Sequence, residues 1–279
     1  METKASGKRV FERQCAGLKQ SKILILRYLN SFNAVRYFSV IQNALPLSAW
    51  TITPMEFRMV VSKLILQTGR GTNAKIFQIQ TARICQALGR NHQFIFANGN
   101  VPTPPDAGAA TISDEFYGYV GETSSELKSL YYDLLDLVNS QGPFDALMGF
   151  SEGGAVAAWM LIENAKYPST FGPLRCAIFF SAAVPFDPDI IRTGIIKPVD
   201  PAVEGEVIKV PTAHVWSDKN DVNSEEARSL ASLCDARVRE TFVHSMGHNV
   251  PGSKHDSEVL AATLRIVERT IERAKDQIF

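Results

Sequence analysis

The sequence predicts an α/β fold with a mostly parallel central sheet and helices on both faces. From about residue 60 onward, short apolar segments alternate with segments whose apolar residues recur at helical spacing. This alternation is typical of βαβ units, whose right-handed connections place helices on both sides of a parallel sheet. A chain of 279 residues can form one such domain, with a core that needs no disulfide or metal.

The first half of this region supplies two strands and two helices. The apolar run at 60–67 ends in a Gly-rich turn and predicts a buried strand. Helical spacing at 73–88, followed by a glycine, predicts a helix, and 93–97 predicts the next strand. The segment 98–110 (NGNVPTPPDAGAA) is rich in Pro and Gly, so we expect neither helix nor sheet there. A helix is predicted at 124–138.

The second half continues the alternation. An apolar strand at 144–149 precedes an Ala-rich helix at 153–162, and 176–181 and 212–216 are further apolar strands. Between these two strands, the stretch around 185–208 is polar, contains several prolines and has little periodicity. The remaining elements are a helix, a strand and a long closing helix, at 225–233, 238–243 and 257–275.

Residues 1–58 differ in character from the rest. They place basic residues in apolar sequence and contain few acidic ones. Three interpretations stay open: an organelle transit peptide, a helix appended to the domain, or a mispredicted gene start with the true start at Met55 or Met59. We therefore predict an N-terminal extension over 1–58 and one domain over 59–279.

Composition excludes several classes of function. Lys plus Arg number 29, as do Asp plus Glu, so the chain has no net charge and no basic run to attract nucleic acid. No segment approaches the ~20 apolar residues that span a bilayer, and no secretory signal is recognisable. The four cysteines form no CxxC pair, which argues against zinc or redox motifs and favours a reducing compartment. A cytoplasmic protein is the expectation.

The strongest motif is GFSEG at 149–153, followed by a further glycine. It lies between an apolar strand and an Ala-rich helix, which is the setting of the G-x-S-x-G nucleophile elbow of α/β-hydrolases. There the serine occupies a strained turn, and a side chain at either flanking position would collide with neighbouring backbone. Ser151 is therefore the candidate nucleophile, and the helix start behind it favours a developing oxyanion.

A serine nucleophile needs a base, and five histidines are available. His248 lies in SMGHNVPG, a loop after the last strand, where an α/β-hydrolase carries its base. His244 is its main rival, four residues earlier. His214 falls within a predicted strand and is expected to be a core residue. Otherwise, surface or supporting roles are expected of His244 and His255, and His92 precedes a strand.

The acid that orients the base is expected between serine and histidine in chain order. Asp218 and Asp221 both follow the strand at 212–216, so the position alone does not separate them, and either could lie in a solvated turn. The oxyanion hole is expected to use the backbone N–H of Glu152 and that of Arg70 in the Gly-rich loop after the first strand. That loop, TGRGTN, lacks the lysine and spacing of phosphate-binding loops.

Four separated motifs resemble those of the FSH-type serine hydrolases of fungi. They are LQTGRGTNAKIFQIQ, GFSEGG, DKNDV and MGHNVP, within about residues 63–275. The resemblance implies a Ser151–Asp221–His248 triad, with Asp221 rather than Asp218 as the acid, and neither a metal nor an organic cofactor. Two residues depart from the pattern. Thr68 replaces the usual His, which could change how the oxyanion loop is held, and Glu152 replaces the usual Gln.

The resemblance also implies an activity. Members of the resembled family are commonly esterases or stand-alone thioesterases of fungal secondary metabolism, so we expect this chain to hydrolyse an ester or thioester with a hydrophobic acyl group. A small-molecule substrate is the expected partner, which the carrier domain of a polyketide synthase could present, in a pocket formed by 98–112 and 185–208. Two alternatives stay open: a fold that binds or cyclises an intermediate without hydrolysis, and a protein-interaction domain.

Overall fold

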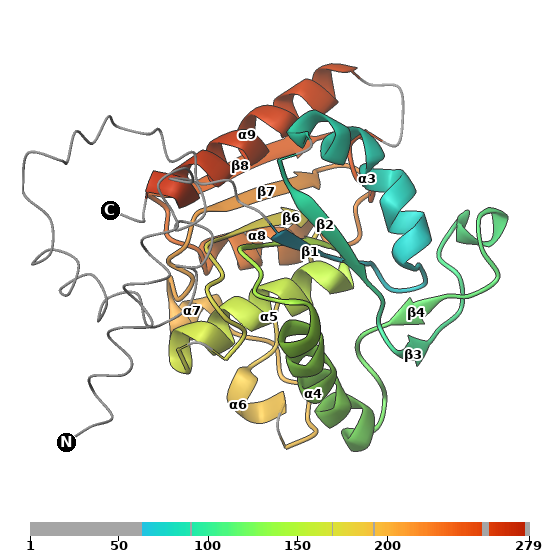
Figure 1. Ribbon diagram of the computed structural model, residues 1–279, viewed down its shortest axis with the longest axis vertical. Coiled ribbons are helices and arrows are strands. Elements are labelled where there is room, and N and C mark those ends of the chain that lie inside the picture. The colour runs from blue at the N-terminus through green and yellow to red at the C-terminus, as the bar shows by residue number, and fades with distance from the viewer. Residues whose placement is uncertain (1–62, 90, 169, 192, 253–256, 277–279) are drawn as a thin grey trace, which may run out of the picture. The chain divides into compact units, whose positions relative to one another are not determined.

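A six-stranded parallel sheet forms the centre of the computed structural model, which describes residues 63–89, 91–168, 170–191, 193–252 and 257–276 (Figure 1). The strand order is β2-β1-β5-β6-β7-β8, and every neighbouring pair is parallel. The strands are β1 (Lys63–Gln67), β2 (Gln93–Ala97), β5 (Ala146–Phe150), β6 (Cys176–Phe180), β7 (Thr212–Ser217) and β8 (Arg239–His244). The predicted parallel α/β-hydrolase fold is confirmed. The predicted extension over 1–58 lies outside the described residues, so that division of the chain stays a prediction.

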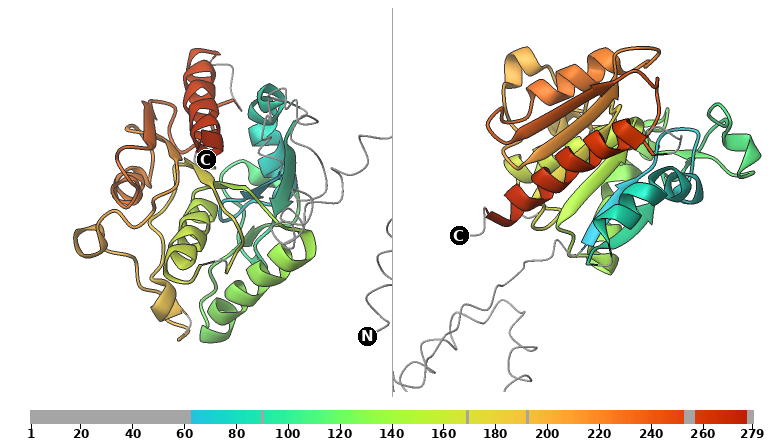
Figure 2. Two further views of the ribbon diagram at one scale, coloured as in Figure 1. Left: turned by 60° about the vertical axis from the view of Figure 1, so that its left-hand side comes forward. Right: turned by 90° about the horizontal axis from the view of Figure 1, so that it is seen from above.

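Helices cover both faces of the sheet, as the alternation of elements predicts (Figures 1 and 2). One face carries α3 (Ala74–Leu88) and α9 (Ser257–Asp276), which contact each other. The other face carries α4 (Ser124–Gln141), α5 (Glu152–Lys166) and α8 (Ser224–Ser232). Local sequence determines where two of them begin. Asn73 accepts a hydrogen bond from Ile76 N at the start of α3, and Thr123 forms a capping box with Glu126 at the start of α4.

The inner strands are apolar on both sides because each side faces a separate core. In β5, Ala146, Met148 and Phe150 belong to the core under α3 and α9. Leu147 belongs to the core under α4 and α5, whose largest fully buried side chain is Trp159. Successive side chains of a strand point to opposite faces, so a strand buried on both faces is a continuous apolar run in the sequence.

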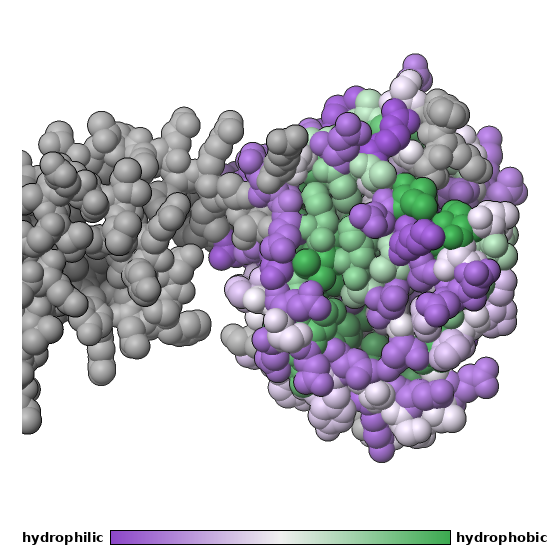
Figure 3. All heavy atoms as spheres, turned by 45° about the vertical axis from the view of Figure 1, so that its right-hand side comes forward, coloured by the Kyte–Doolittle hydropathy of each residue, from purple (hydrophilic) through white to green (hydrophobic). Residues whose placement is uncertain are grey.

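The edge strand β2 is less buried than the inner strands. Its residues from Phe94 to Phe96 are only half-buried. On the face that Figure 3 shows, apolar surface gathers in a band bordered by polar side chains. None of the helices within the described ranges has the length and apolar character needed to cross a membrane.

The irregular segments contain more structure than the sequence predicts. The expectation that 98–110 forms neither helix nor sheet is wrong, because β3 (Val101–Pro102) pairs antiparallel with β4 (Tyr117–Gly118), and Ala109–Thr111 forms a 3₁₀ turn. A pairing of two residues per strand leaves no periodic pattern in the sequence. The polar stretch around 185–208 likewise contains two four-residue helices, α6 (Pro188–Ile191) and α7 (Pro201–Glu204).

Candidate active site

The carboxyl ends of the inner strands bring polar residues to one edge of the sheet. Ser151 follows β5, Ser181 follows β6, and Ser217 ends β7. In open parallel sheets, ligands bind outside this edge because loops from several strands converge there. The candidate site is built at this edge.

Ser151 has the strained backbone that a nucleophile elbow requires. Its φ of 54° and ψ of −120° lie in a region that residues other than glycine rarely adopt. The turn is held by hydrogen bonds from Ser151 N to Phe180 O at 3.0 Å and from Gly154 N to Ser151 O at 3.0 Å. Helix α5 begins at the next residue, Glu152, so the first backbone N–H groups of this helix have no partner within it. The strand–turn–helix setting predicted for GFSEG is present.

The glycines on both sides of Ser151 are required by close backbone contacts. A Cβ added to Gly149 would lie 2.5 Å from Gly153 O. A Cβ added to Gly153 would overlap the backbone carbonyl oxygens of Gln67 and Thr68 at the end of β1. These absent side chains let α5 approach β1 closely enough to place Ser151 above the sheet edge.

Replacing Gly153 with Ala is expected to destabilise the protein by about 3 kcal/mol or more. Alanine favours a helix over glycine by only about 1 kcal/mol, which does not offset a collision with two backbone carbonyls. The control is Gly172→Ala, because a Cβ at Gly172 meets nothing within 4 Å and incurs only the left-handed strain of its φ of 81°. Urea unfolding compares the two variants. Equal stabilities would contradict the close contact at Gly153.

Asp221 and His248 form a hydrogen-bonded pair at this edge. His248 Nδ1 lies 2.7 Å from Asp221 Oδ1. The side chain of His248 is 20% exposed, whereas that of Asp221 is fully buried. The imidazole also packs on the ring of Phe150, with ring centroids 4.8 Å apart, and Phe150 directly precedes Ser151. The structure therefore brings the predicted base and acid together beside the elbow.

The Asp221 carboxylate is kept ionised by its hydrogen bonds. Burial disfavours the charged form, but the donors around the carboxylate outweigh burial and hold the pKa of Asp221 well below its usual range. These donors are the His248 side chain, Ser181 Oγ at 2.6 Å, Ser217 N at 3.1 Å and Asn223 N at 3.0 Å. Asp218, the alternative acid, has an exposed side chain. A buried anion fixed by four donors can hold an imidazole in one tautomer.

The other described histidines occupy structural positions. Burial, with a smaller contribution from Arg239, lowers the pKa of His214 to about 3, and its Nε2 lies 3.0 Å from Thr212 Oγ1 within β7, as expected of a core residue. His244, the rival base, is buried at the end of β8, where its Nδ1 accepts a hydrogen bond from Met246 N at 3.1 Å. It is therefore not a surface residue. His92 is half-buried, and His255 lies outside the described residues.

The loop after β1 comes close to Ser151, as an oxyanion loop must. A Cβ added to Gly69 would lie 3.4 Å from Ser151 Cβ. Buried Thr72 donates its hydroxyl hydrogen bond to Gly69 O at 2.6 Å. In a trans peptide the N–H points opposite to the C=O, so this bond also fixes the direction of the Arg70 N–H. The geometry is compatible with backbone donors at Arg70 and Glu152.

The two departures from the family pattern have structural partners. The Glu152 carboxylate accepts hydrogen bonds from Tyr119 N at 2.8 Å and Val120 N at 3.3 Å, and pairs with Arg70 Nη1 at 3.2 Å. The Arg70 side chain also donates from Nη1 to Val120 O at 2.8 Å. Thr68 donates its backbone N–H to the buried Tyr119 hydroxyl at 3.3 Å. Tyr119 thus contacts the start of the loop after β1, which is the predicted oxyanion loop.

Two residues of the site were missed in the sequence. Ser181 donates to Asp221, and Asn223 contacts both Asp221 and Ser151, because Asn223 Nδ2 lies 3.3 Å from Ser151 Oγ. Ser181 could have been found as the polar residue that directly follows a buried strand at the same edge as Ser151. Asn223 had no comparable signal, because asparagine is common in turns.

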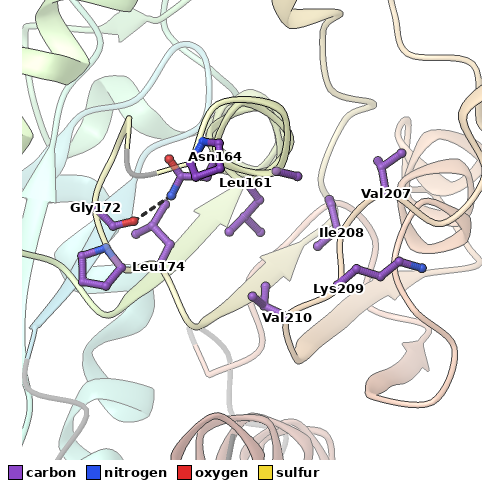
Figure 4. Close-up of a pocket in the computed structure, with 11 residues that line it drawn as sticks. Leu161, Asn164, Gly172, Leu174, Val207, Ile208, Lys209 and Val210 are labelled. Carbon is purple, nitrogen blue, oxygen red and sulfur yellow. Dashed lines mark hydrogen bonds between the residues drawn. The ribbon is translucent and has the colours of Figure 1, made fainter. Parts of the chain in front are cut away.

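The pocket in Figure 4 lies away from this site. It is lined by the second half of α5, by Gly172–Leu174 before β6 and by Val207–Val210 before β7, so it is at the amino ends of the strands (Figure 4). Only Val207 and Ile208 come from the predicted pocket-forming stretch 185–208. A five-residue strand spans about 17 Å, which separates this pocket from Ser151.

Within the described residues, no group of three or more His, Cys, Asp or Glu side chains could hold a metal ion.

Comparison with known proteins identifies a family of serine hydrolases. The family model described as "Serine hydrolase (FSH1)" matches residues 59–260. The chain is 30% identical to Esterase FPY3 of Fusarium mangiferae, over 76% of this chain and 98% of that protein. It is 28% identical to Hydrolase phiM of Talaromyces stipitatus, over 74% and 87% of the two chains. The solved structure of Arabidopsis thaliana SOBER1 aligns with a TM-score of 0.47 at 16% identity, over 75% of this chain and 99% of that one.

Proposed function

The chain belongs to the FSH1 family of serine hydrolases, and from this premise we propose that it cleaves a carboxylic ester or thioester with Ser151 as nucleophile, His248 as base and Asp221 as the orienting acid. The observation that supports these roles is the buried, ionised Asp221 on His248 Nδ1, next to a serine in a strained elbow. The mechanism follows from what each group can do.

In the acylation step, Ser151 Oγ attacks the carbonyl carbon and its proton passes to His248 Nε2. The carbonyl π electrons move to the oxygen, and the backbone N–H groups of Glu152 and Arg70 donate to this oxyanion. The oxyanion then collapses, and the leaving alkoxide or thiolate takes the proton from His248. Water repeats the sequence on the acyl-enzyme, with His248 as base, and releases the acid and free Ser151. Throughout, Asp221 stays ionised and stabilises the imidazolium.

We propose that the protein recognises a hydrophobic acyl group of its substrate. The loop that carries Asp221 exposes Val222, the residue next to this acid. An apolar side chain beside the site favours an apolar acyl chain over a charged one. The fungal relatives are named esterases and hydrolases, which fits a role in secondary metabolism such as the release of a polyketide, either free or on a carrier domain.

Covalent labelling tests the nucleophile. Wild-type protein treated with a fluorophosphonate is expected to gain one phosphonyl group, mapped to the peptide that contains Ser151, because the probe reacts with activated serines. Intact mass spectrometry measures the adduct, and Ser151→Ala is the control that should gain none. Folded wild type without an adduct would refute the mechanism and favour a protein that binds or cyclises an intermediate without hydrolysis. An adduct at another serine would refute the assignment of Ser151.

A further inference from the structure

Asn223 has a side chain in an unexpected position for its place in the fold. It is the residue before the first turn of α8, where asparagine commonly accepts a hydrogen bond from the helix backbone. In the structure, the Asn223 side chain makes no such bond to α8. It turns instead toward the carboxyl ends of β5 and β6. The helix therefore forgoes a stabilising cap, and the side chain is available to the site.

The orientation of the Asn223 amide follows from its partners. Nδ2 lies 3.0 Å from Ser181 O and 3.3 Å from Ser151 Oγ. A carbonyl oxygen can only accept, so the group that faces Ser181 O must be the NH₂ group and not the amide oxygen. One of its two hydrogens is directed to Ser181 O, and the second is available to Ser151 Oγ.

From these contacts we propose that Asn223 is a further catalytic residue, which donates a hydrogen bond to Ser151 Oγ. The proposal rests on the proposed function. With a lone pair of Oγ engaged by Asn223, the hydroxyl proton is free to be directed to another acceptor, which in the proposed mechanism is the imidazole of His248. Asn223 keeps its own protons, so the atoms transferred in each step stay as described above.

The hydrogen bond matters most when Oγ carries charge. Charge builds on Oγ as its proton leaves in acylation, and again when the bond between Oγ and the acyl carbon breaks in deacylation. A donor that faces a group which becomes charged stabilises it more than one that faces a neutral group. Asn223 therefore contributes to both half-reactions through the same contact.

The backbone of Asn223 has a separate role that the test must leave intact. Asn223 N donates to Asp221 Oδ1 at 3.0 Å, and this bond does not depend on the side chain. Asn223→Ala therefore removes the donor to Ser151 while keeping the donor to Asp221. Asn223→Asp adds a contrast, because a carboxylate can accept the Ser151 proton and so divert it from His248.

The test compares Asn223→Ala and Asn223→Asp with wild type, using p-nitrophenyl butyrate as substrate. We expect kcat to fall about 10- to 100-fold in Asn223→Ala with KM nearly unchanged, the loss expected for one hydrogen bond to a group that becomes charged. The decrease should be larger in Asn223→Asp. The downfield proton NMR resonance of His248 Nδ1–H should remain in Asn223→Ala, because the Asp221–His248 pair is intact.

The control is Asn164→Ala, which removes side-chain hydrogen bonds to Gly172 O and Phe171 N, each 2.8 Å long, on the far half of α5. It should lower stability without changing kcat. Wild-type kcat in Asn223→Ala would overturn the proposal, as would a loss of kcat that coincides with loss of the downfield resonance, since Asn223 would then act only through Asp221. Wild type that hydrolyses nothing and resists the fluorophosphonate would instead refute the proposed function itself.

Discussion

Replacing His248 with Asn is expected to lower kcat for ester hydrolysis by about 10⁶-fold, the loss typical of a removed triad base. Asparagine can place its Nδ2 near the position of His248 Nδ1 and so keep the hydrogen bond to Asp221, 2.7 Å long in the wild type. It has no group at the position of Nε2, so nothing accepts the Ser151 proton. Single-turnover hydrolysis of an activated ester, measured with folded protein, quantifies the loss.

The matched control is His244→Asn, which tests the rival base. The amide oxygen of asparagine can replace His244 Nδ1 as the acceptor of Met246 N, so the turn after β8 should be retained. We expect kcat to stay within about 5-fold of wild type, which corresponds to roughly 1 kcal/mol of indirect change. A larger loss in His244→Asn than in His248→Asn would reverse the assignment of the base.

The sheet and the elbow could be predicted from the sequence because their signals are local. β5 is buried on both faces, so its apolar run is visible without knowledge of its partners. The glycines around Ser151 stand directly beside it in the chain. The β3–β4 pairing could not be predicted, because two short segments separated by a 14-residue loop pair with only two residues each, and Val101 pairs with Gly118.

The choice between the two candidate acids could not be made from the residues alone. Asp218 and Asp221 follow the same strand, three positions apart, and both residues are common in turns. Only the family resemblance favoured Asp221. The structure separates them physically, since the Asp221 side chain is buried among four donors whereas Asp218 is exposed. One of these donors, Ser181, lies 40 residues earlier in the chain, so the residues around Asp221 do not reveal it.

Replacing Asp221 with Asn is expected to lower kcat by about 10⁴-fold. An amide that donates to His248 Nδ1 forces the imidazole proton onto Nε2, so the ring cannot accept the proton of Ser151. The variant should also lose about 1–3 kcal/mol of stability. In either orientation of the new amide, its NH₂ group replaces an oxygen that accepts a backbone N–H, from Ser217 or from Asn223, so two donors face each other. Steady-state hydrolysis and urea unfolding measure the two effects separately.

Asp218→Asn is the matched control, and its kcat should change by no more than about 2-fold, as for an exposed substitution.

The pH dependence of stability gives a second test of Asp221. The pKa of Asp221 is lowered in the folded protein, so its stabilising contribution is complete above the unfolded pKa of about 3.9 and is lost as the pH falls through the lower folded value. Asp221→Asn should remove this part of the acid-induced loss of stability, whereas Asp218→Asn should retain it. If Asp218→Asn were the variant that lost activity, the buried carboxylate on His248 would not be the catalytic acid.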